Sequence, residues 1–155
     1  MAEWKNTLKE IYCLFVRQAL EFAAPVWTSS LTKQNIRNLE KLQEYATDLI
    51  CGPNNTMSYE RRLNDLSLVS LEERRWSITS RFAVKLAKDP EFNHLFPVRR
   101  SRVTRNSDKY IEPRAFTRRY MVSPIPTYIR LLNEKDKQNK RQNNWKHDTR
   151  STDDP

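Results

Sequence analysis

The sequence contains little glycine, cysteine or histidine, and these shortages exclude several classes of protein. Gly52 is the single glycine among 155 residues. The glycine-rich phosphate loops of P-loop and Rossmann folds are therefore excluded, because they need several backbone positions without a Cβ atom. Tight turns between strands also favour glycine, which argues against a sheet-rich domain. Two cysteines and two histidines are too few for a Cys/His zinc site of known spacing. We expect no metal ion and no other cofactor.

Long apolar runs are also absent. The first ten residues include four charged side chains, and the longest apolar run, residues 11–16, ends at Arg17. This run is too short to span a membrane and is wrongly placed for a signal peptide. We expect a soluble intracellular protein, in the nucleus or the cytoplasm, with no membrane partner. In such a compartment Cys13 and Cys51 stay reduced.

Apolar residues and charge are distributed unevenly along the chain. About 45% of residues 1–98 are apolar, which is typical of globular domains, against about 25% of residues 99–155. The net charge is +1 over the first segment and +8 over the second. We therefore expect a helical domain over residues 1–98 and a basic extension with a short docking helix over residues 99–133. Residues 134–155 are expected to be a disordered tail.

Apolar residues at helical spacing predict three long helices and a short one in the first 98 residues. The first ends before Pro25, because proline disfavours the helical conformation of the preceding residue. The second begins after Thr32 as N-cap and ends at Gly52. Ser58 caps the short helix, and Ser70 begins a capping box for the third long helix, which continues to about residue 88. The fold class is therefore all-α: a small helical bundle followed by a basic, largely irregular C-terminal extension.

The same spacing predicts which positions form the apolar stripes of these helices. They are Leu8, Ile11, Tyr12, Phe15, Ala19 and Phe22 in the first, Ile36, Leu39, Leu42, Ala46, Leu49 and Ile50 in the second, and Leu71, Ile78, Phe82 and Leu86 in the third. Beyond residue 98 the periodicity disappears, and prolines at 113, 124 and 126 interrupt any long element. One short apolar run, residues 125–132, has helical spacing and is expected to dock back on the bundle.

No group of residues has the pattern of a catalytic site. The adjacent carboxylates Asp153 and Asp154 lie at the end of the sequence with no apolar strand beside them. Glu72 and Glu73 are placed to interact with the N-terminus of a helix. We interpret His94, between apolar neighbours, as a packed or surface residue. No catalytic residues and no metal ligands are therefore predicted, and the chain is not expected to be an enzyme.

The basic segment is the candidate nucleic-acid-binding site. Residues 99–133 carry nine basic and two acidic side chains, a net charge of +7. Eight of the nine are arginines, whose planar guanidinium suits phosphate. Four interleaved aromatics are candidates for stacking on unpaired bases: Tyr110, Phe116, Tyr120 and Tyr128. A solvated tail or a nuclear localisation signal is the alternative interpretation. The candidate binding residues are Arg99, Arg100, Arg102, Arg105, Lys109, Arg114, Arg118, Arg119 and Arg130.

Five segments occur in an order that is similar to one known family. Residues 12–27 read YCLFVRQALEFAAPVW, residues 31–46 LTKQNIRNLEKLQEYA, residues 59–75 YERRLNDLSLVSLEERR, residues 90–97 PEFNHLFP and residues 123–133 SPIPTYIRLLN. The first resembles the pattern Y-x-x-x-(I/V)-R-x-x-L-E-Y-x-x-P-V-W, with Phe22 where the pattern has tyrosine. Together they resemble the region after the catalytic core of reverse transcriptases from non-LTR (LINE-type) retrotransposons, particularly jockey-like elements. The resemblance covers about residues 4–133.

The resemblance implies a non-catalytic C-terminal fragment of an RNA-directed DNA polymerase, comprising its thumb and the extension after it. In that family the fingers and palm hold the metal-binding aspartates in an (F/Y)-x-D-D motif, which nothing here matches. A thumb holds the template–primer duplex of RNA and/or DNA by its backbone, independently of sequence. Residues 71–88 and the basic segment are the implied surfaces. The palm domain is an implied partner, with apolar positions exposed around Trp4, Phe22 and Trp27. The alternatives are a decayed or truncated retroelement reading frame without selected activity, and a small helical protein-interaction module.

Overall fold

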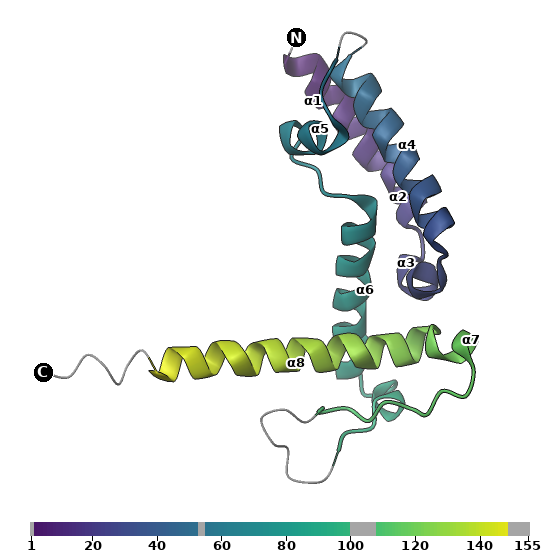
Figure 1. Cartoon of the computed structure of the whole chain (residues 1–155), viewed down its shortest axis with the longest axis vertical. Helices are drawn as coiled ribbons and strands as arrows, with labels where there is room; N and C mark the ends of the chain where they lie inside the picture. Colours follow the sequence, from purple (N-terminus) through teal and green to yellow (C-terminus); the bar gives the residue numbers. More distant parts are fainter. Residues whose placement is uncertain (1, 53–54, 100–107, 149–155) are drawn as a thin grey trace, which may run out of the picture. The chain divides into compact units, whose positions relative to one another are not determined.

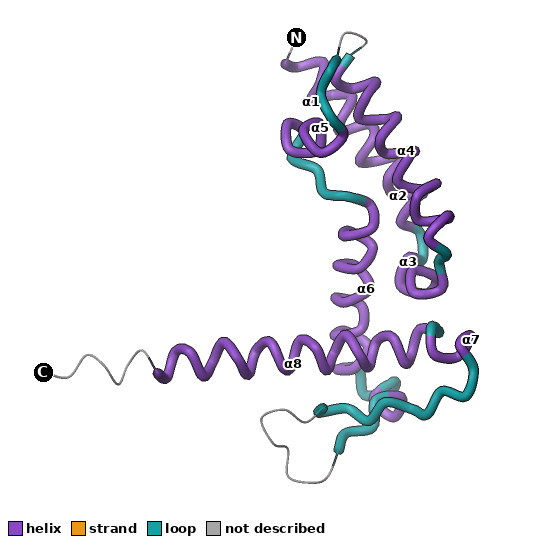
Figure 2. Tube along the Cα trace, viewed as in Figure 1, coloured by secondary structure: helices purple, strands orange, loops and turns teal. Residues whose placement is uncertain are grey.

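The protein is helical throughout most of its length, which confirms the all-α class (Figure 1). The computed structural model describes residues 2–52, 55–99 and 108–148. Within these ranges no strand forms (Figure 2), and one isolated β-bridge joins Val98 and Tyr110. The elements are α1 (Ala2–Ile11), a π-helical turn (Tyr12–Val16), α2 (Arg17–Glu21), α3 (Ala24–Trp27), a 3₁₀ turn (Thr28–Ser30), α4 (Lys33–Cys51), α5 (Tyr59–Asp65), α6 (Leu71–Lys88), a 3₁₀ turn (Asn93–Leu95), α7 (Arg118–Met121) and α8 (Pro124–Asp148).

The chain divides into two compact units, and the boundary lies inside α6. The first unit is Met1–Thr79 and the second is Ser80–Pro155. We expected the boundary after residue 98, where composition and charge change. The structure places it earlier because the second half of α6 packs its apolar side chains against α8, in a core separate from that of the first unit.

The predicted ends of α4 are confirmed, whereas the predicted end of the first long helix at Pro25 is wrong, because Pro25 lies in the first turn of α3, where a missing amide hydrogen is tolerated. α1, the π-helical turn and α2 form one helical run, which ends where Phe22 leaves the helical conformation and Ala23 takes a φ of 51°. Thr32 accepts a hydrogen bond from the Asn35 amide at 3.2 Å and begins α4. Gly52, with a φ of 95°, ends it.

The other two predicted N-caps, Ser58 and Ser70, are also present. The Ser58 hydroxyl accepts from the Arg61 amide at 3.4 Å at the start of α5. The Ser70 hydroxyl accepts from the Glu73 amide at 3.2 Å at the start of α6. Each cap satisfies an amide that has no partner within the first turn of its helix. The starts of α4, α5 and α6 therefore follow from short-range side-chain chemistry.

The core of the first unit combines a small apolar cluster with a buried polar network. The apolar cluster consists of Tyr12, Ile50, Leu63, Leu66 and Leu68. Gln43 of α4 is fully buried beside it. Its carboxamide oxygen accepts from the Tyr12 hydroxyl at 2.8 Å, and its nitrogen donates to the Val69 carbonyl at 2.9 Å and to the Tyr59 hydroxyl at 3.0 Å. This network joins the first helical run, α4 and the segments around α5, because each group satisfies another that is removed from water.

The apolar stripes predicted for the first and second long helices are largely uncovered. Ile11, Phe15, Phe22, Leu42 and Leu49 are exposed, and only Tyr12 and Ile50 of the two stripes are buried. The face of α4 that packs inside the unit carries Gln43 and Thr47 instead. The prediction of the face was wrong because periodicity identifies an apolar stripe without identifying what covers it.

α6 also buries a different face from the one predicted. The buried positions follow a four-residue spacing: Leu71, Arg75, Thr79 and Ala83. Of the predicted inward residues, Leu71 is buried, Ile78 and Leu86 are half-buried, and Phe82 is exposed. The prediction of the buried face was wrong because it assumed that only apolar residues occupy interior positions, whereas Arg75 and Thr79 are buried. Arg75 is accommodated against the Trp27 ring, with its guanidinium carbon 5.9 Å from the ring centroid.

The second unit has its own apolar core, between the second half of α6 and the first half of α8. Its buried members are Ala83, Phe96, Tyr128, Ile129 and Leu132. The Phe82 and Tyr128 rings meet edge to face, with centroids 5.8 Å apart. Residues 125–132 therefore do form a docking helix, as predicted, and they dock on the part of α6 that belongs to this unit.

α8 continues well past the predicted docking helix. It extends through Asp148, so the prediction of disorder from residue 134 is wrong for residues 134–148. Residues 127–148 contain no glycine or proline, and eight of them are Lys, Arg or Gln, which are favourable in a helix whether or not they are packed. An ion pair between Asp136 and Lys140, four residues apart, supports the same conformation. Residues 149–155 lie outside the described residues.

Candidate nucleic-acid interface

Six of the nine predicted binding residues lie in the part of the chain that the structure describes. They are Arg99, Lys109, Arg114, Arg118, Arg119 and Arg130, all in the second unit. Arg100, Arg102 and Arg105 lie outside the described residues. The six fall into three groups: two on paired extended segments, three in and before α7, and one on α8.

Arg99 and Lys109 are held side by side by the backbone. The Arg99 amide donates to the Lys109 carbonyl at 2.9 Å, and the Ile111 amide donates to the Pro97 carbonyl at 2.8 Å. Both side chains are exposed. The Lys109 ammonium lies 5.3 Å from the centroid of the Tyr110 ring, which is a cation–π contact. This pairing brings together two cations that are ten positions apart in the sequence.

Asn133 of α8 fixes the position of this paired segment. Its side-chain oxygen accepts from the Tyr110 amide at 2.9 Å, and its nitrogen donates to the Tyr110 carbonyl at 3.1 Å. Asn133 is buried, and the Tyr110 ring packs edge-on against Phe96 with centroids 6.4 Å apart. A segment without regular secondary structure is thereby tied to the core of the second unit. Asn133 was not among the predicted site residues, because its pairing with a backbone 23 positions away has no signal in the sequence.

The second group is presented around the short helix α7. Arg118 and Arg119 are the first two residues of this helix, and the Thr117 hydroxyl caps it by accepting from the Tyr120 amide at 3.2 Å. Both arginines and the preceding Arg114 are exposed. Among the residues that the structure describes, no ion pair neutralises Arg99, Lys109 or these three arginines. Five exposed cations in one unit are thus free of described acidic partners.

Arg130 differs from the others because it is engaged within the unit. It is half-buried, its Nη2 donates to the Met121 carbonyl at 2.5 Å and to the Thr127 hydroxyl at 3.3 Å, and its Nε lies 3.5 Å from a Glu112 oxygen. These contacts hold the end of α7 and the Glu112 segment against α8. Arg130 therefore positions neighbouring segments in this structure, whereas the sequence suggested direct contact with phosphate.

The four aromatic residues of the segment have different environments. Tyr128 is buried, so the expectation that it stacks on bases is wrong; burial also raises the pKa of its hydroxyl. Tyr110 is half-buried against Phe96. Phe116 is 92% exposed and Tyr120 is 44% exposed. Phe116 and Tyr120 therefore remain available as stacking surfaces close in sequence to the arginines of α7.

A second basic stripe lies on α6, the helix that the resemblance implies as a binding surface, but its individual residues were not named from the sequence. Arg81, Lys85 and Lys88 are exposed, belong to the second unit, and are spaced four and three residues apart, which places them on one side of the helix. The spacing of these like charges is the sequence signal that could have identified the stripe. The other two basic residues of this helix are engaged: Arg74 hydrogen-bonds Glu21, and Arg75 is buried against Trp27, where desolvation lowers the pKa of its guanidinium.

The exposed cations of the second unit are suited to binding an anion. No group of three or more His, Cys, Asp or Glu side chains is placed to hold a metal ion among the residues described. Across the same residues, no helix has the length and apolar character needed to cross a membrane. No protein-family model, no curated protein and no solved structure matches the chain. The class of protein that the fold and the exposed cations define is an all-α protein with a basic second unit.

Proposed function

We propose that the second unit binds nucleic acid through backbone phosphates, as the thumb and post-thumb region of a non-LTR retrotransposon reverse transcriptase, and contributes binding rather than catalysis. The observation that carries this proposal is the set of five exposed cations without described acidic partners, on segments anchored to one core. Four of the five are arginines, which donate pairs of hydrogen bonds to phosphate oxygens. The resemblance of five ordered segments to that family supports the same function.

The contacts are expected to be independent of sequence. Phosphate oxygens are the same at every nucleotide, so cations that bind them determine position and affinity but do not read bases. Phe116 adds a stacking surface for an unpaired base, and stacking also tolerates any base. An RNA–DNA hybrid with a short single-stranded template overhang offers both features and is the natural probe.

The first test measures how binding of this hybrid depends on salt. If about five phosphates are neutralised, log K against log salt concentration should fall with a slope of roughly −4 to −5. Fluorescence anisotropy of a labelled hybrid, between about 50 and 200 mM salt, measures this slope. An affinity that does not change with salt would contradict the proposed phosphate contacts.

A pair of matched double variants tests which unit binds. Arg118→Gln with Arg119→Gln should lower affinity at low salt and reduce the slope by about 2, because each lost phosphate contact contributes about 1. Lys33→Gln with Arg37→Gln is the control, since it removes the same charge from exposed positions on α4 in the first unit. Equal losses in both variants would show that net charge alone drives binding and that α7 has no specific part in it.

A further inference from the structure

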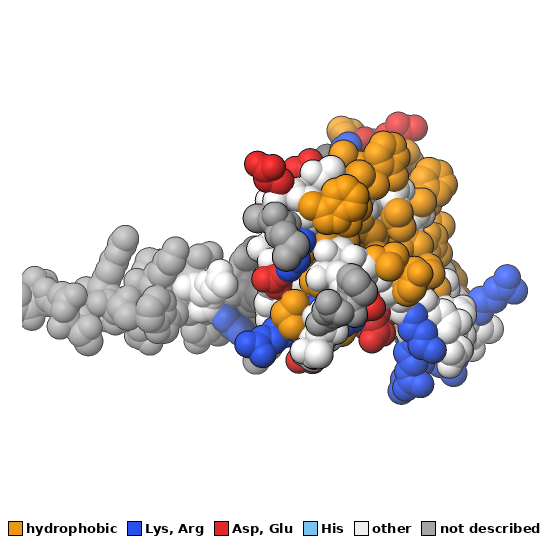
Figure 3. Space-filling model, turned by 90° about the horizontal axis from the view of Figure 1, so that it is seen from above, with side chains coloured by type: hydrophobic (Ala, Val, Ile, Leu, Met, Phe, Trp, Pro, Cys, Tyr) orange, Lys and Arg blue, Asp and Glu red, His pale blue; other side chains and the backbone are white. Residues whose placement is uncertain are grey.

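The first unit leaves a large apolar surface uncovered. Trp4 is 67% exposed, Phe15 is 72% exposed and Phe22 is 80% exposed. Ile11, Leu42 and Leu49 are each about half-exposed or more. Figure 3 shows apolar side chains gathered in one area of the face in view. We call the six side chains Trp4, Ile11, Phe15, Phe22, Leu42 and Leu49 the open face.

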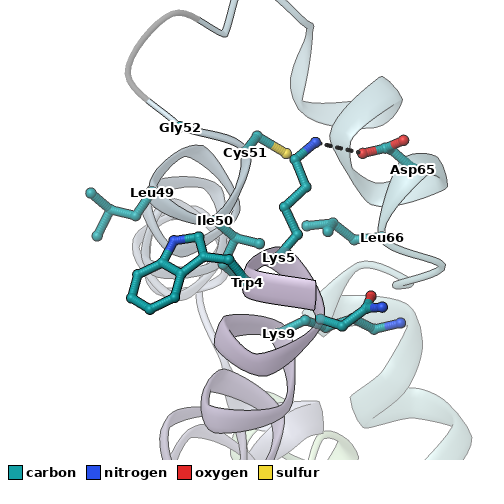
Figure 4. A pocket seen from close by; sticks show the side chains of 10 residues that line it. Trp4, Lys5, Lys9, Leu49, Ile50, Cys51, Gly52, Asp65 and Leu66 are labelled. Carbon is teal, nitrogen blue, oxygen red and sulfur yellow. Dashed lines mark ion pairs between the residues drawn. The ribbon is translucent and has the colours of Figure 1, made fainter. Parts of the chain in front are cut away.

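The six side chains form one surface because of their spacing and their neighbours. Trp4, Ile11 and Phe15 are separated by seven and four residues, and Leu42 and Leu49 on α4 by seven, so each set follows one side of its helix. Phe22 follows directly after the end of α2. Trp4 and Leu49 line the same cavity of about 780 Å³, where the indole lies alongside Leu49 and Ile50 (Figure 4). Phe22 and Leu39 line a second hollow. The open face therefore extends along both helices.

The inner side of this helix pair is already occupied. Tyr12 and Gln43 point into the core and join the network that includes Tyr59 and Val69. The open face lies on the other side of the same helices, and the Lys5–Asp65 ion pair, at 3.5 Å, lies in the cavity that Trp4 and Leu49 line. An occupant must therefore cover mainly apolar side chains, with a charged pair at one end.

The size of the open face fits a stable protein–protein contact. At about 150–250 Å² for a large apolar side chain, the exposed fractions leave on the order of 550 to 950 Å² uncovered. The largest apolar patch on a typical monomer is about 300–600 Å². A standard interface buries about 800 Å² on each partner. Together with a rim of polar side chains, the open face offers about the area that one partner buries in such an interface.

We propose that the open face binds the open face of a second copy of this chain. Two pairs of antiparallel helices that stack apolar side to apolar side make a four-helix arrangement, in which each copy supplies the surface that the other needs. The flanking charges suit this pairing. Glu3 and Glu10 are exposed next to the open face on α1, and Lys41 is exposed next to it on α4. The opposite charges beside them are already paired within the unit, Lys5 with Asp65 and Asp48 with Arg62. Stacking α1 of one copy on α4 of the other brings unlike charges together.

The test is the oligomeric state of the full-length protein, measured by sedimentation equilibrium at high salt with a reducing agent. These conditions exclude dimers bridged by nucleic acid or by Cys13 and Cys51. We expect a dimer at about 10 μM. Phe15→Glu and Leu42→Glu should each weaken it by at least about 100-fold, because each places two charges in an apolar contact. Phe116→Glu, the same kind of change at an exposed position of the second unit, is the control.

Both open-face variants are expected to keep the helical circular dichroism of the wild type, since both positions are at least half-exposed in the single chain. A wild-type protein that stays monomeric to about 100 μM would overturn the proposal and assign the face to a different protein surface, such as a polymerase palm. Dimerisation that survives both open-face variants would also overturn it. So would a dimer that Phe116→Glu dissociates. Nucleic-acid affinity is measured separately, so neither result depends on the other.

Discussion

Two tyrosine hydroxyls in the first unit are held away from water beside Gln43. Tyr12 is 3% exposed, and burial raises the pKa of its hydroxyl well above the ordinary value of 10.0. Burial also raises the pKa of Tyr59, and a hydrogen bond to the Glu40 carboxylate raises it further. In both cases the neutral hydroxyl is the form that fits the folded protein, because it donates a hydrogen bond and needs no hydration of an anion.

This burial predicts a loss of stability at alkaline pH. Above the unfolded pKa of about 10, the unfolded chain releases the Tyr12 proton while the folded chain retains it, so the free energy of unfolding falls as pH rises. The stabilisation is complete below pH 10.0 and is lost as the pH approaches the raised folded pKa. One retained proton corresponds to a slope of about 1.4 kcal/mol per pH unit.

Tyr12→Phe should remove the contribution of this one proton to the pH dependence of the free energy of unfolding. At neutral pH the variant loses the hydrogen bond to Gln43 and should be less stable by about 1 kcal/mol. Urea titrations at about pH 8 and about pH 11 should show the difference between variant and wild type becoming smaller at the higher pH. Tyr45→Phe, at an exposed position of α4, is the control. A gap that stays constant between the two pH values would argue against a buried, protonated Tyr12.

At the scale of the elements, capped helix ends are predictable and helix faces are less so. Thr32, Ser58 and Ser70 cap their helices as expected, because a cap depends on residues within three positions. The interior of α4 contains Gln43 because its partners, Tyr12 and Val69, come from distant segments. Apolar periodicity alone cannot reveal such a network.

In the candidate site too, composition is visible in the sequence, whereas the contacts made by packing are not. The abundance of arginine after residue 98 is visible in the sequence, and five cations are exposed as expected. The engagement of Arg130 with Met121 and Glu112 depends on how α8 packs, so sequence spacing does not predict it. The stripe on α6, by contrast, follows from spacing alone.

Replacing Gly52, at the end of α4, even by alanine should destabilise the protein. Its φ of 95° and ψ of 164° lie in a region that residues with a Cβ atom rarely adopt. Nothing lies within 4 Å of a Cβ added there, so the cost is backbone strain rather than a clash. Gly52→Ala should lower the free energy of unfolding by about 1–3 kcal/mol in a urea titration. Ser77→Ala, at an exposed position within α6, should be neutral or slightly stabilising. Equal stability of Gly52→Ala and wild type would show that α4 ends differently in solution.

At the scale of the whole molecule, two separate cores predict that the chain can lose structure in parts. The first core includes Leu63 and the second includes Ile129, and no buried residue is shared between them. α6 supplies buried residues to both units, Leu71 to the first and Ala83 to the second. Amide hydrogen exchange distinguishes opening of one unit from global unfolding.

A truncated side chain in either core should therefore act mainly on its own unit. Ile129→Ala removes a fully buried side chain and should lower stability locally by about 2–5 kcal/mol, with faster exchange in the first half of α8 and the second half of α6. Amides of α4 should keep their protection. Leu63→Ala, in the first core, should show the converse pattern. If each variant instead accelerates exchange equally in α4 and α8, the chain unfolds as one cooperative unit. In that case α6 transmits the loss of either core to the other, because its hydrogen bonds run without a break across the boundary between Thr79 and Ser80.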